Sequence, residues 1–202
     1  FDTPNDVEFD HVNNRLFTLD EGNGRIMVHN TNSQGIPNDN IADYVLGLPN
    51  MTTPFDSCLA TASSFCSPNS IAIDTTNNRL FVSDTGANRI LVFDIGSLSN
   101  GMGAEYVIGQ IDFENLGSES TSTTLYLPLG IVYDSTNEYL YVSDSGNNRV
   151  LGYDLSEGIS NGMAASRVIG QLNFTDNLSN RGGGMDVNTL STPDGIAIDN
   201  TN

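Results

Sequence analysis

The stretch RLFVSDTGANRI, Arg79–Ile90, decides the fold. It returns as YLYVSDSGNNRV over Tyr139–Val150 and, more loosely, as RLFTLDEGNGRI over Arg15–Ile26. Each copy holds two short runs rich in β-branched and aromatic residues around a turn of Asp, Gly and Asn, which is the pattern of a β-hairpin. Copies of one hairpin along one chain indicate a protein built of stacked repeats.

The repeat extends beyond the hairpin. A proline opens each copy, at Pro4, Pro68, Pro128 and Pro193. We therefore read the chain as one array over residues 1–202, with repeats at approximately 4–67, 68–127 and 128–192 and a partial repeat at 193–202. Phe1–Pro4 also matches Leu190–Pro193, so we expect this chain to be cut or processed from something longer.

Each full repeat is expected to hold four short strands. In the second repeat these are Ser70–Asp74, Leu80–Ser83, Arg89–Ile95 and Tyr106–Ile108. In the third they are Gly130–Asp134, Leu140–Ser143, Arg149–Leu155 and Arg167–Ile169. The third strand is apolar on both faces, which favours a small sheet covered on both sides by its neighbours. The predicted fold is all-β: a propeller of four-stranded antiparallel blades, with three blades and the first strand of a fourth.

The string PNSIAIDTTNNRLFVSDTGANRILVFDI, followed by YVIGQIDF, resembles the NHL-repeat β-propellers, in the bacterial style with a long insert after each fourth strand. The third repeat resembles them equally. The first departs from the pattern, because Leu46–Pro49 replaces the Gly-Gln ending and His29-Asn30 replaces Phe93-Asp94. The resemblance implies a ring of about six blades. Three blades cannot close such a ring, so we expect a longer native chain or self-association into a closed ring or a filament.

Charge excludes one class of partner. The formal net charge is −18, from 25 acidic residues against seven arginines, and the sequence has no lysine. Proteins bind nucleic-acid phosphates through clusters of Arg and Lys, so we expect no nucleic-acid partner and reject an RNA-binding role. No apolar run approaches the length of a membrane-spanning helix, and we expect no membrane insertion.

Two cysteines, Cys58 and Cys66, lie in a stretch rich in Ser, Thr and Ala. We interpret them as a disulfide that closes a long loop, in a protein from an oxidising compartment. The alternative is a pair of free thiols in a cytosolic loop. A metal site is poorly supported, since no His or second Cys pair stands nearby.

The Asp-x-Gly-x-Asn-Arg turns are the most regular polar feature. A functional reading would have them display Arg to an anionic ligand. We favour a structural role instead, because Asp and Asn side chains bond turn amides, Gly accepts positive φ, and a site usually breaks repeat symmetry. The residues concerned are Asp84, Gly86, Asn88 and Arg89, then Asp144, Gly146, Asn148 and Arg149, and Asp20 and Arg25 in the first repeat.

The residue after each proline is expected at the mouth of the central channel. These positions, Asn5, Asn69, Leu129 and Asp194, vary between repeats and offer oxygen atoms that suit calcium. Some propeller hydrolases and lactonases that the fold resembles hold calcium at such a place. The alternative function is therefore a secreted propeller hydrolase or lyase with a metal here, although we expect no cofactor. Only two histidines occur, and no catalytic motif is present, so no catalytic residue is assigned.

The inserts Gly47–Ser67, Asp112–Leu127 and Asn173–Thr192 differ while the blade phrases agree. Loops on a rigid scaffold carry binding, so we expect partner contacts there. Three glycosylation sequons lie in or near these inserts, at Asn50, Asn173 and Asn177. The sequence therefore predicts an extracellular or cell-surface structural or binding module with a protein or carbohydrate partner, or one that self-associates, and without catalysis.

Overall fold

A computed structural model describes residues 1–55 and 57–199. The described residues form three four-stranded antiparallel sheets, each with its strands in chain order. Blade 1 comprises β1 (Pro4–Asp10), β2 (Arg15–Asp20), β3 (Arg25–Asn30) and β4 (Tyr44–Leu46). Blade 2 comprises β5 (Pro68–Asp74), β6 (Arg79–Asp84), β7 (Arg89–Asp94) and β8 (Tyr106–Ile108). Blade 3 comprises β9 (Pro128–Asp134), β10 (Tyr139–Asp144), β11 (Arg149–Asp154) and β12 (Arg167–Ile169).

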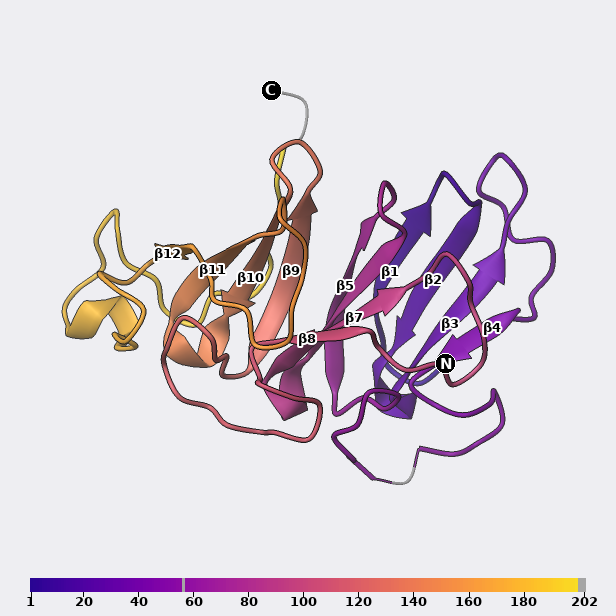
Figure 1. The fold of residues 1–202 in the computed structure, drawn as a ribbon, viewed down its shortest axis with the longest axis horizontal. Helices are drawn as coiled ribbons and strands as arrows, with labels where there is room; N and C mark the ends of the chain where they lie inside the picture. The colour runs from indigo at the N-terminus through magenta and orange to yellow at the C-terminus, as the bar shows by residue number, and fades with distance from the viewer. Residues whose placement is uncertain (56, 200–202) are drawn as a thin grey trace.

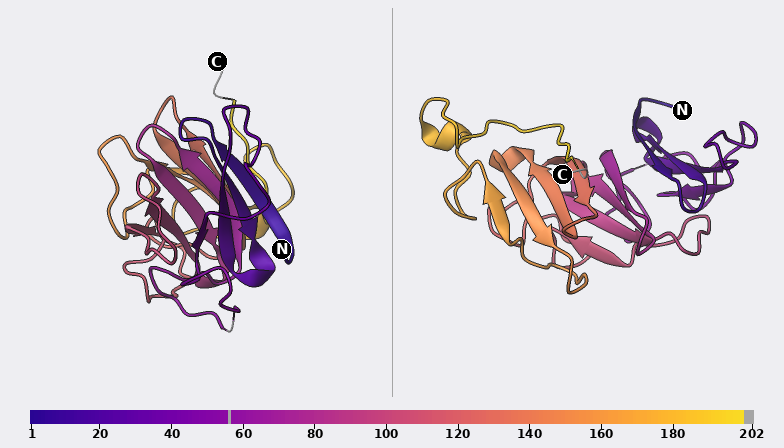
Figure 2. Two further views of the ribbon diagram at one scale, coloured as in Figure 1. Left: turned by 90° about the vertical axis from the view of Figure 1, so that its right-hand side faces the viewer. Right: turned by 90° about the horizontal axis from the view of Figure 1, so that it is seen from above.

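The sheets stand side by side as blades, with β1, β5 and β9 next to one another (Figure 1). Viewed from above, they follow one another along an open arc (Figure 2). The predicted all-β architecture of propeller-type blades is confirmed. None of the described residues forms an α-helix, and none of their helical segments is long and apolar enough to cross a membrane.

Apolar side chains between neighbouring blades form two cores. Between blades 1 and 2, Phe17 and Val28 belong to one cluster with Leu80 and Leu91, all buried. Between blades 2 and 3, the Phe81 ring stacks on Tyr133 with 5.6 Å between ring centroids. Blade 2 is thus covered on both sides, which explains why its third strand is apolar on both faces.

The inner strands begin two residues earlier than expected, because each opens on a β-bulge. The pairing register of β5 with β6 shifts between Pro68 and Ser70, so Asn69 is the extra residue of the bulge. The register of β1 with β2 shifts at the same place, between Pro4 and Asp6. Asn5 and Asn69, the residues after these two prolines, therefore interrupt the regular strand pairing because they are the extra residues of the bulges.

The expected first strand of a fourth blade is not formed. Residues 193–199 run beside β9, where the Asp194 carbonyl accepts a hydrogen bond from Gly130 N at 3.2 Å, but they are not part of a strand. A β-strand is defined by its ladder with a neighbouring strand, and none of the three sheets of the described residues includes this segment. The prediction was wrong on this point for that reason.

Candidate functional site at the insert-bearing edge

All three inserts lie at one edge of the blades. Each insert follows the fourth strand of its blade and leads to the next first strand or, after β12, to residues 193–199. Because the strands of a blade are antiparallel, both ends of an insert lie at the edge where the second strand turns into the third. Figure 1 shows these loops together at the lower and left side of the molecule. This edge is the candidate functional site.

The turns at this edge are short 3₁₀ helices. In blade 2, η2 (Thr85–Ala87) ends at Asn88, which has a left-handed φ of 54°. Asn148 ends η3 (Ser145–Asn147) with the same φ, and Gly24 ends η1 (Glu21–Asn23) in blade 1. Asn and Gly are the residues that adopt this conformation most readily, which explains their place in the repeated phrase.

The arginine of each turn is buried, not displayed. Arg89 and Arg149 have no exposed side-chain area, and each pairs with the aspartate five residues before it. The Nε–Oδ2 distances are 2.8 Å to Asp84 and 2.6 Å to Asp144. Burial raises the pKa of Asp84 above its usual range, while Arg89 and the Cys66 N–H oppose that rise.

The same guanidinium groups hold the ends of two consecutive inserts. Arg149 donates to the carbonyls of Thr121 and Thr124, at 2.8 and 3.1 Å, and to that of Phe174. Arg89 does the same with Thr61, Ser64 and Phe113. The charge is thus satisfied by one carboxylate and three carbonyls, and these contacts hold the bases of the inserts against the blades.

Blade 1 carries a weaker version of this arrangement. Arg25 pairs with Asp20 at 2.7 Å, but its side chain is 17% exposed, and its Nη1 donates to the Met51 carbonyl at 2.9 Å. Burial alone would raise the pKa of Asp20, yet the hydrogen bonds from Asp2 N and Arg25 outweigh it and the pKa is lowered. In this pair the Asp20 carboxylate has a lowered pKa and the Arg25 side chain is partly solvated.

The Gly-Gln ending of the fourth strand has a role that the sequence analysis missed. Gln110 Nε2 donates to the carbonyls of Asn88 and Gly117, at 2.9 and 2.7 Å. Gln171 makes the equivalent bonds to Asn148 and Leu178. The glutamine therefore joins the turn to the first residues of the insert. The recurrence of Gln110 and Gln171 at one position of two repeats could have indicated this role from the sequence.

Cys58 and Cys66 form a disulfide in the structure, as predicted. Cys66 is buried, its N–H bonds the Asp84 carboxylate, and its carbonyl accepts Gly86 N at 2.7 Å. In the next repeat Tyr126 makes the same two backbone contacts, to Asp144 and Gly146. The disulfide thus closes one insert where the other repeats rely on hydrogen bonds.

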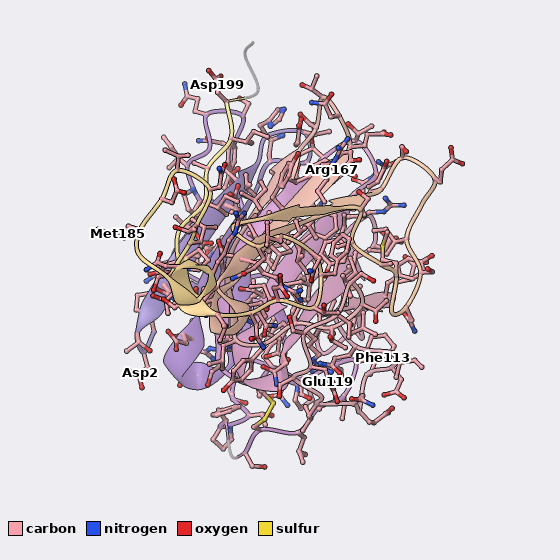
Figure 3. All side chains as sticks on the ribbon, turned by 90° about the vertical axis from the view of Figure 1, so that its left-hand side faces the viewer. Asp2, Phe113, Glu119, Arg167, Met185 and Asp199 are labelled. Carbon is pink, nitrogen blue, oxygen red and sulfur yellow. A yellow bond between two sulfur atoms is a disulfide. The ribbon has the colours of Figure 1, made fainter. Side chains whose placement is uncertain are left out.

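The outer surface of the inserts is apolar and acidic. It carries exposed large apolar side chains, namely Phe55, Leu59, Leu116, Tyr126, Leu127, Leu178, Met185 and Val187. It also carries exposed acidic residues, among them Asp112, Glu114, Glu119 and Asp186. A groove of about 310 Å³ on the first insert is lined by Pro49, Phe55 and Leu59. Figure 3 labels Phe113, Glu119 and Met185 among the side chains of the second and third inserts, with Met185 at the edge of the view.

Of the predicted channel-mouth residues, Asn5, Asn69 and Leu129 lie on β1, β5 and β9, and Asp194 lies beside β9. Asn5 Nδ2 donates to the Asn69 carbonyl at 3.0 Å, and the adjacent Asp6 carboxylate accepts Ser70 Oγ and Ile71 N, both at 2.8 Å. Asp194 bonds Gly130 through its backbone carbonyl. These contacts join blade to blade. Within the described part of the chain, no three His, Cys, Asp or Glu side chains gather as metal ligands would.

The three sequon asparagines are exposed. Asn50 and Asn173 each accept backbone N–H bonds from the following residues, in local turns, and Asn177 lies on the third insert. All three side chains are therefore accessible to solvent.

The fold and the repeated turns define the chain as a set of β-propeller blades. The second blade carries an NHL repeat, because the family model described as "NHL repeat" matches residues 65–93. The predicted family resemblance is confirmed at this stretch. NHL-repeat propellers are a type of protein-binding module.

Two solved structures are similar to the chain. One is titled "Crystal structure of Nidogen/Laminin Complex", with 20% sequence identity, a TM-score of 0.49, and coverage of 85% of this chain and 49% of the other. The second, "Structure of U3-55K", has 11% identity, a TM-score of 0.48, and coverage of 82% and 38%. This chain spans about half of those chains or less. No curated protein matches it.

Proposed function

We propose that this protein is an extracellular or cell-surface propeller module whose inserts bind a protein partner. The observation that carries the proposal is the edge itself: three inserts of different sequence lie on one side of a rigid scaffold, and buried arginines hold their bases. Binding loops on rigid scaffolds have this organisation. The NHL repeat in blade 2 supports the proposal, because NHL-repeat propellers are a type of protein-binding module.

The chemistry of the edge indicates the kind of partner. Exposed Leu, Val and Met side chains provide apolar contact area, and the surrounding carboxylates favour a basic surface opposite them. The net charge of −18 would accelerate encounter with a basic protein. We therefore propose a basic protein partner.

Two features support the extracellular location. The Cys58–Cys66 disulfide forms and persists in oxidising compartments. The sequon asparagines are exposed and could carry glycans there. The location is tested by protease treatment of intact cells and by analysis of the culture medium. Recovery of the protein only from the cytosol would contradict it.

The binding role is tested with matched charge variants on the immobilised full chain. The insert variant carries Asp112→Asn, Glu114→Gln and Glu119→Gln. The control variant carries Asp39→Asn, Glu105→Gln and Glu157→Gln, three exposed acidic residues at the opposite edge. Quantitative mass spectrometry of secreted proteins should show basic proteins that the native chain and the control retain and the insert variant loses. Equal retention by both variants would refute the proposed binding edge.

A further inference from the structure

Each insert forms a pocket at the same place in its repeat. The pockets are lined by Leu48 and Pro49 in the first repeat, by Gln110 and Ile111 in the second, and by Gln171 and Leu172 in the third. These pairs are equivalent, because each follows the positive-φ glycine at the end of the fourth strand. The pockets therefore repeat in position and differ in the side chains that line them.

The pocket of the second repeat, which we call the Glu119 pocket, has a volume of about 470 Å³. It lies between two blades, because its walls come from the end of β8, the second insert and the β11–β12 connection of blade 3. None of the described residues that line it carries a positive charge. The residues that give it its chemistry are Gln110, Ile111, Asn115, Glu119, Thr124 and Asn161.

The Glu119 carboxylate lies beside a bare glycine. A Cβ on Gly117 would lie 2.6 Å from Glu119 Oε2 and 3.3 Å from Asn115 Oδ1. Both oxygen atoms therefore border the space that Gly117 leaves open, and a side chain at residue 117 would fill that space. Two acceptors around one open space suit a group that donates several hydrogen bonds.

The buried Gln110 side chain adds a further acceptor. Its Nε2 donates to the carbonyls of Asn88 and Gly117, at 2.9 and 2.7 Å, so its carbonyl oxygen Oε1 is the atom left for a ligand. In the third repeat the equivalent atom, Gln171 Oε1, is buried without a hydrogen-bond partner among the described residues. A buried amide oxygen without a partner favours a donor from outside the chain, because leaving it unpaired costs free energy.

Internal hydrogen bonds fix the walls of the pocket. Thr124 Oγ1 donates to the Glu119 carbonyl at 2.6 Å, and the Thr124 carbonyl accepts Arg149 Nη2 at 3.1 Å. On the opposite wall, Asn161 Oδ1 accepts Val107 N at 3.0 Å. The walls are thus held in place before a ligand binds, which reduces the entropy that binding costs.

The charge of the Glu119 carboxylate is not used inside the chain. The four ion pairs of the described residues use other carboxylates, those of Asp10, Asp20, Asp84 and Asp144. A positively charged ligand would therefore pair with Glu119 without breaking an existing ion pair.

The pockets of the other two inserts lack this combination. In the first, Leu48 stands in place of Gln110 and Leu59 in place of Glu119. Leu59 is the equivalent residue because its carbonyl accepts Ser64 Oγ as the Glu119 carbonyl accepts Thr124 Oγ1. In the third pocket, Arg181 is a lining residue and would repel a cation. Among the three pockets, the one in the second repeat is therefore the one suited to a cation.

A guanidinium group fits the acceptors of the Glu119 pocket. It is planar and carries five N–H donors, so it can pair with a carboxylate through two of them and reach amide oxygens with others. Ile111, which is 71% exposed, offers apolar surface to the methylene groups of an arginine side chain. An ammonium group is a compact point charge and would satisfy fewer of these acceptors.

We propose that the Glu119 pocket receives an arginine side chain of the protein partner. This inference rests on the proposed function, because it names the residue type through which a basic partner docks on the insert-bearing edge. The Glu119 carboxylate pairs with the guanidinium, the amide oxygens of Gln110 and Asn115 accept its remaining N–H groups, and the aliphatic part of the arginine packs on Ile111.

The test is an NMR titration of the isotope-labelled full chain with the amide of Nα-acetylarginine. Salt at about 0.15 M screens the general attraction between the acidic chain and any cation. The backbone amides of Gly117, Glu119 and Gly162 should show saturable shifts. The lysine analogue should bind more weakly, and the citrulline analogue, in which a neutral urea replaces the guanidinium, should give no saturable shift.

Two variants and one matched control locate the site. Glu119→Gln removes the charge, whereas Gly117→Ala keeps every charge and displaces the carboxylate, because the new Cβ would lie 2.6 Å from Glu119 Oε2. Gly117 has a φ outside the left-handed region, so alanine adds no backbone strain there. Each variant should weaken arginine binding by about tenfold. Glu105→Gln, at an exposed glutamate on the opposite edge of the same blade, should leave the binding unchanged.

The proposal is overturned if the arginine probe gives no saturable shifts at the pocket, if the lysine probe binds equally well, or if Glu119→Gln and Glu105→Gln have equal effects. If the insert variant nevertheless loses basic proteins in the retention experiment, the binding edge stands and only the arginine pocket is refuted. A pocket that binds the arginine probe in a chain that retains no basic protein would refute the proposed protein partner instead.

Discussion

Arg149 Nε lies 2.6 Å from Asp144 Oδ2, and neither side chain has any exposed area. Arg89 and Asp84 repeat the relationship at 2.8 Å one blade earlier. These pairs form within a hairpin, but their remaining hydrogen bonds reach two inserts, so each pair joins local structure to the candidate binding edge.

Replacement of Arg149 should be strongly destabilising. Arg149→Met leaves the Asp144 carboxylate buried without its counter-ion and frees three insert carbonyls. Loss of one partner of a buried pair costs about 3–5 kcal/mol of unfolding free energy. Denaturant unfolding measures it. Arg167→Met, at an exposed arginine over the Tyr139 ring, is the control and should cost about 1 kcal/mol or less. Equal losses would contradict the role of Arg149.

Removal of the disulfide should destabilise the first insert. Cys58→Ser with Cys66→Ser opens a loop closed over a sequence separation of eight residues, which should cost about 2–3 kcal/mol. The Tm should fall by about 4–12 °C for a chain of this size. Reductant should lower the Tm of the native protein and leave that of the double variant unchanged. A native Tm insensitive to full reduction would refute this prediction.

Stability should depend on pH through Asp134. The hydrogen bond from Asn137 Nδ2, at 2.8 Å, lowers the pKa of Asp134, and burial opposes this only in part. A pKa below the unfolded value means that ionised Asp134 stabilises the fold above that value, and that the contribution is lost as the pH falls through the folded pKa.

Asn137→Ala should therefore cost about 1 kcal/mol at pH 7. The difference from the native chain should shrink as the pH falls from the unfolded value, about 4, through the lower pKa of folded Asp134. Urea unfolding at several pH values measures it, with Asn40→Ala, at an exposed asparagine, as the control. A pH-independent difference would show that the bond does not favour the charged form.

The close packing of Leu125 on Gly109, at the junction of blades 2 and 3, can be tested apart from backbone strain. Gly109 and Gly158 both have positive φ, at +84° and +99°, but a Cβ on Gly158 meets nothing within 4 Å. Gly158→Ala should cost about 1 kcal/mol from the backbone alone. Gly109→Ala should cost about 2–3 kcal/mol more, because Leu125 must move in a packed core. Equal costs, measured by thermal or denaturant unfolding, would argue against a stabilising contact between Leu125 and Gly109.

Much of the fold could be predicted from local patterns. The hairpins follow from short β-branched and aromatic runs around Asp, Gly and Asn turns, and their left-handed residues fall at Asn88 and Asn148. The strand limits were short by up to two residues at Pro68 and Pro128, because a bulge after the proline is invisible to a period-two pattern. Residues 193–199 carry a strand sequence but form no strand in the structure, because strand formation depends on a ladder with a neighbouring strand, which the residues of the segment alone do not reveal.

The sequence by itself determined the repeats, the hairpin turns, the pairing of two cysteines and the acidic surface, because each depends on residues close together or on composition. The tertiary structure decided that Arg89 and Arg149 are buried, that glutamines join turns to inserts, and that Leu190 covers Gly170. These contacts join segments up to 28 residues apart, such as Arg149 and Thr121. Only the stacking of blades brings such segments together, since no local propensity encodes which carbonyl a guanidinium will reach.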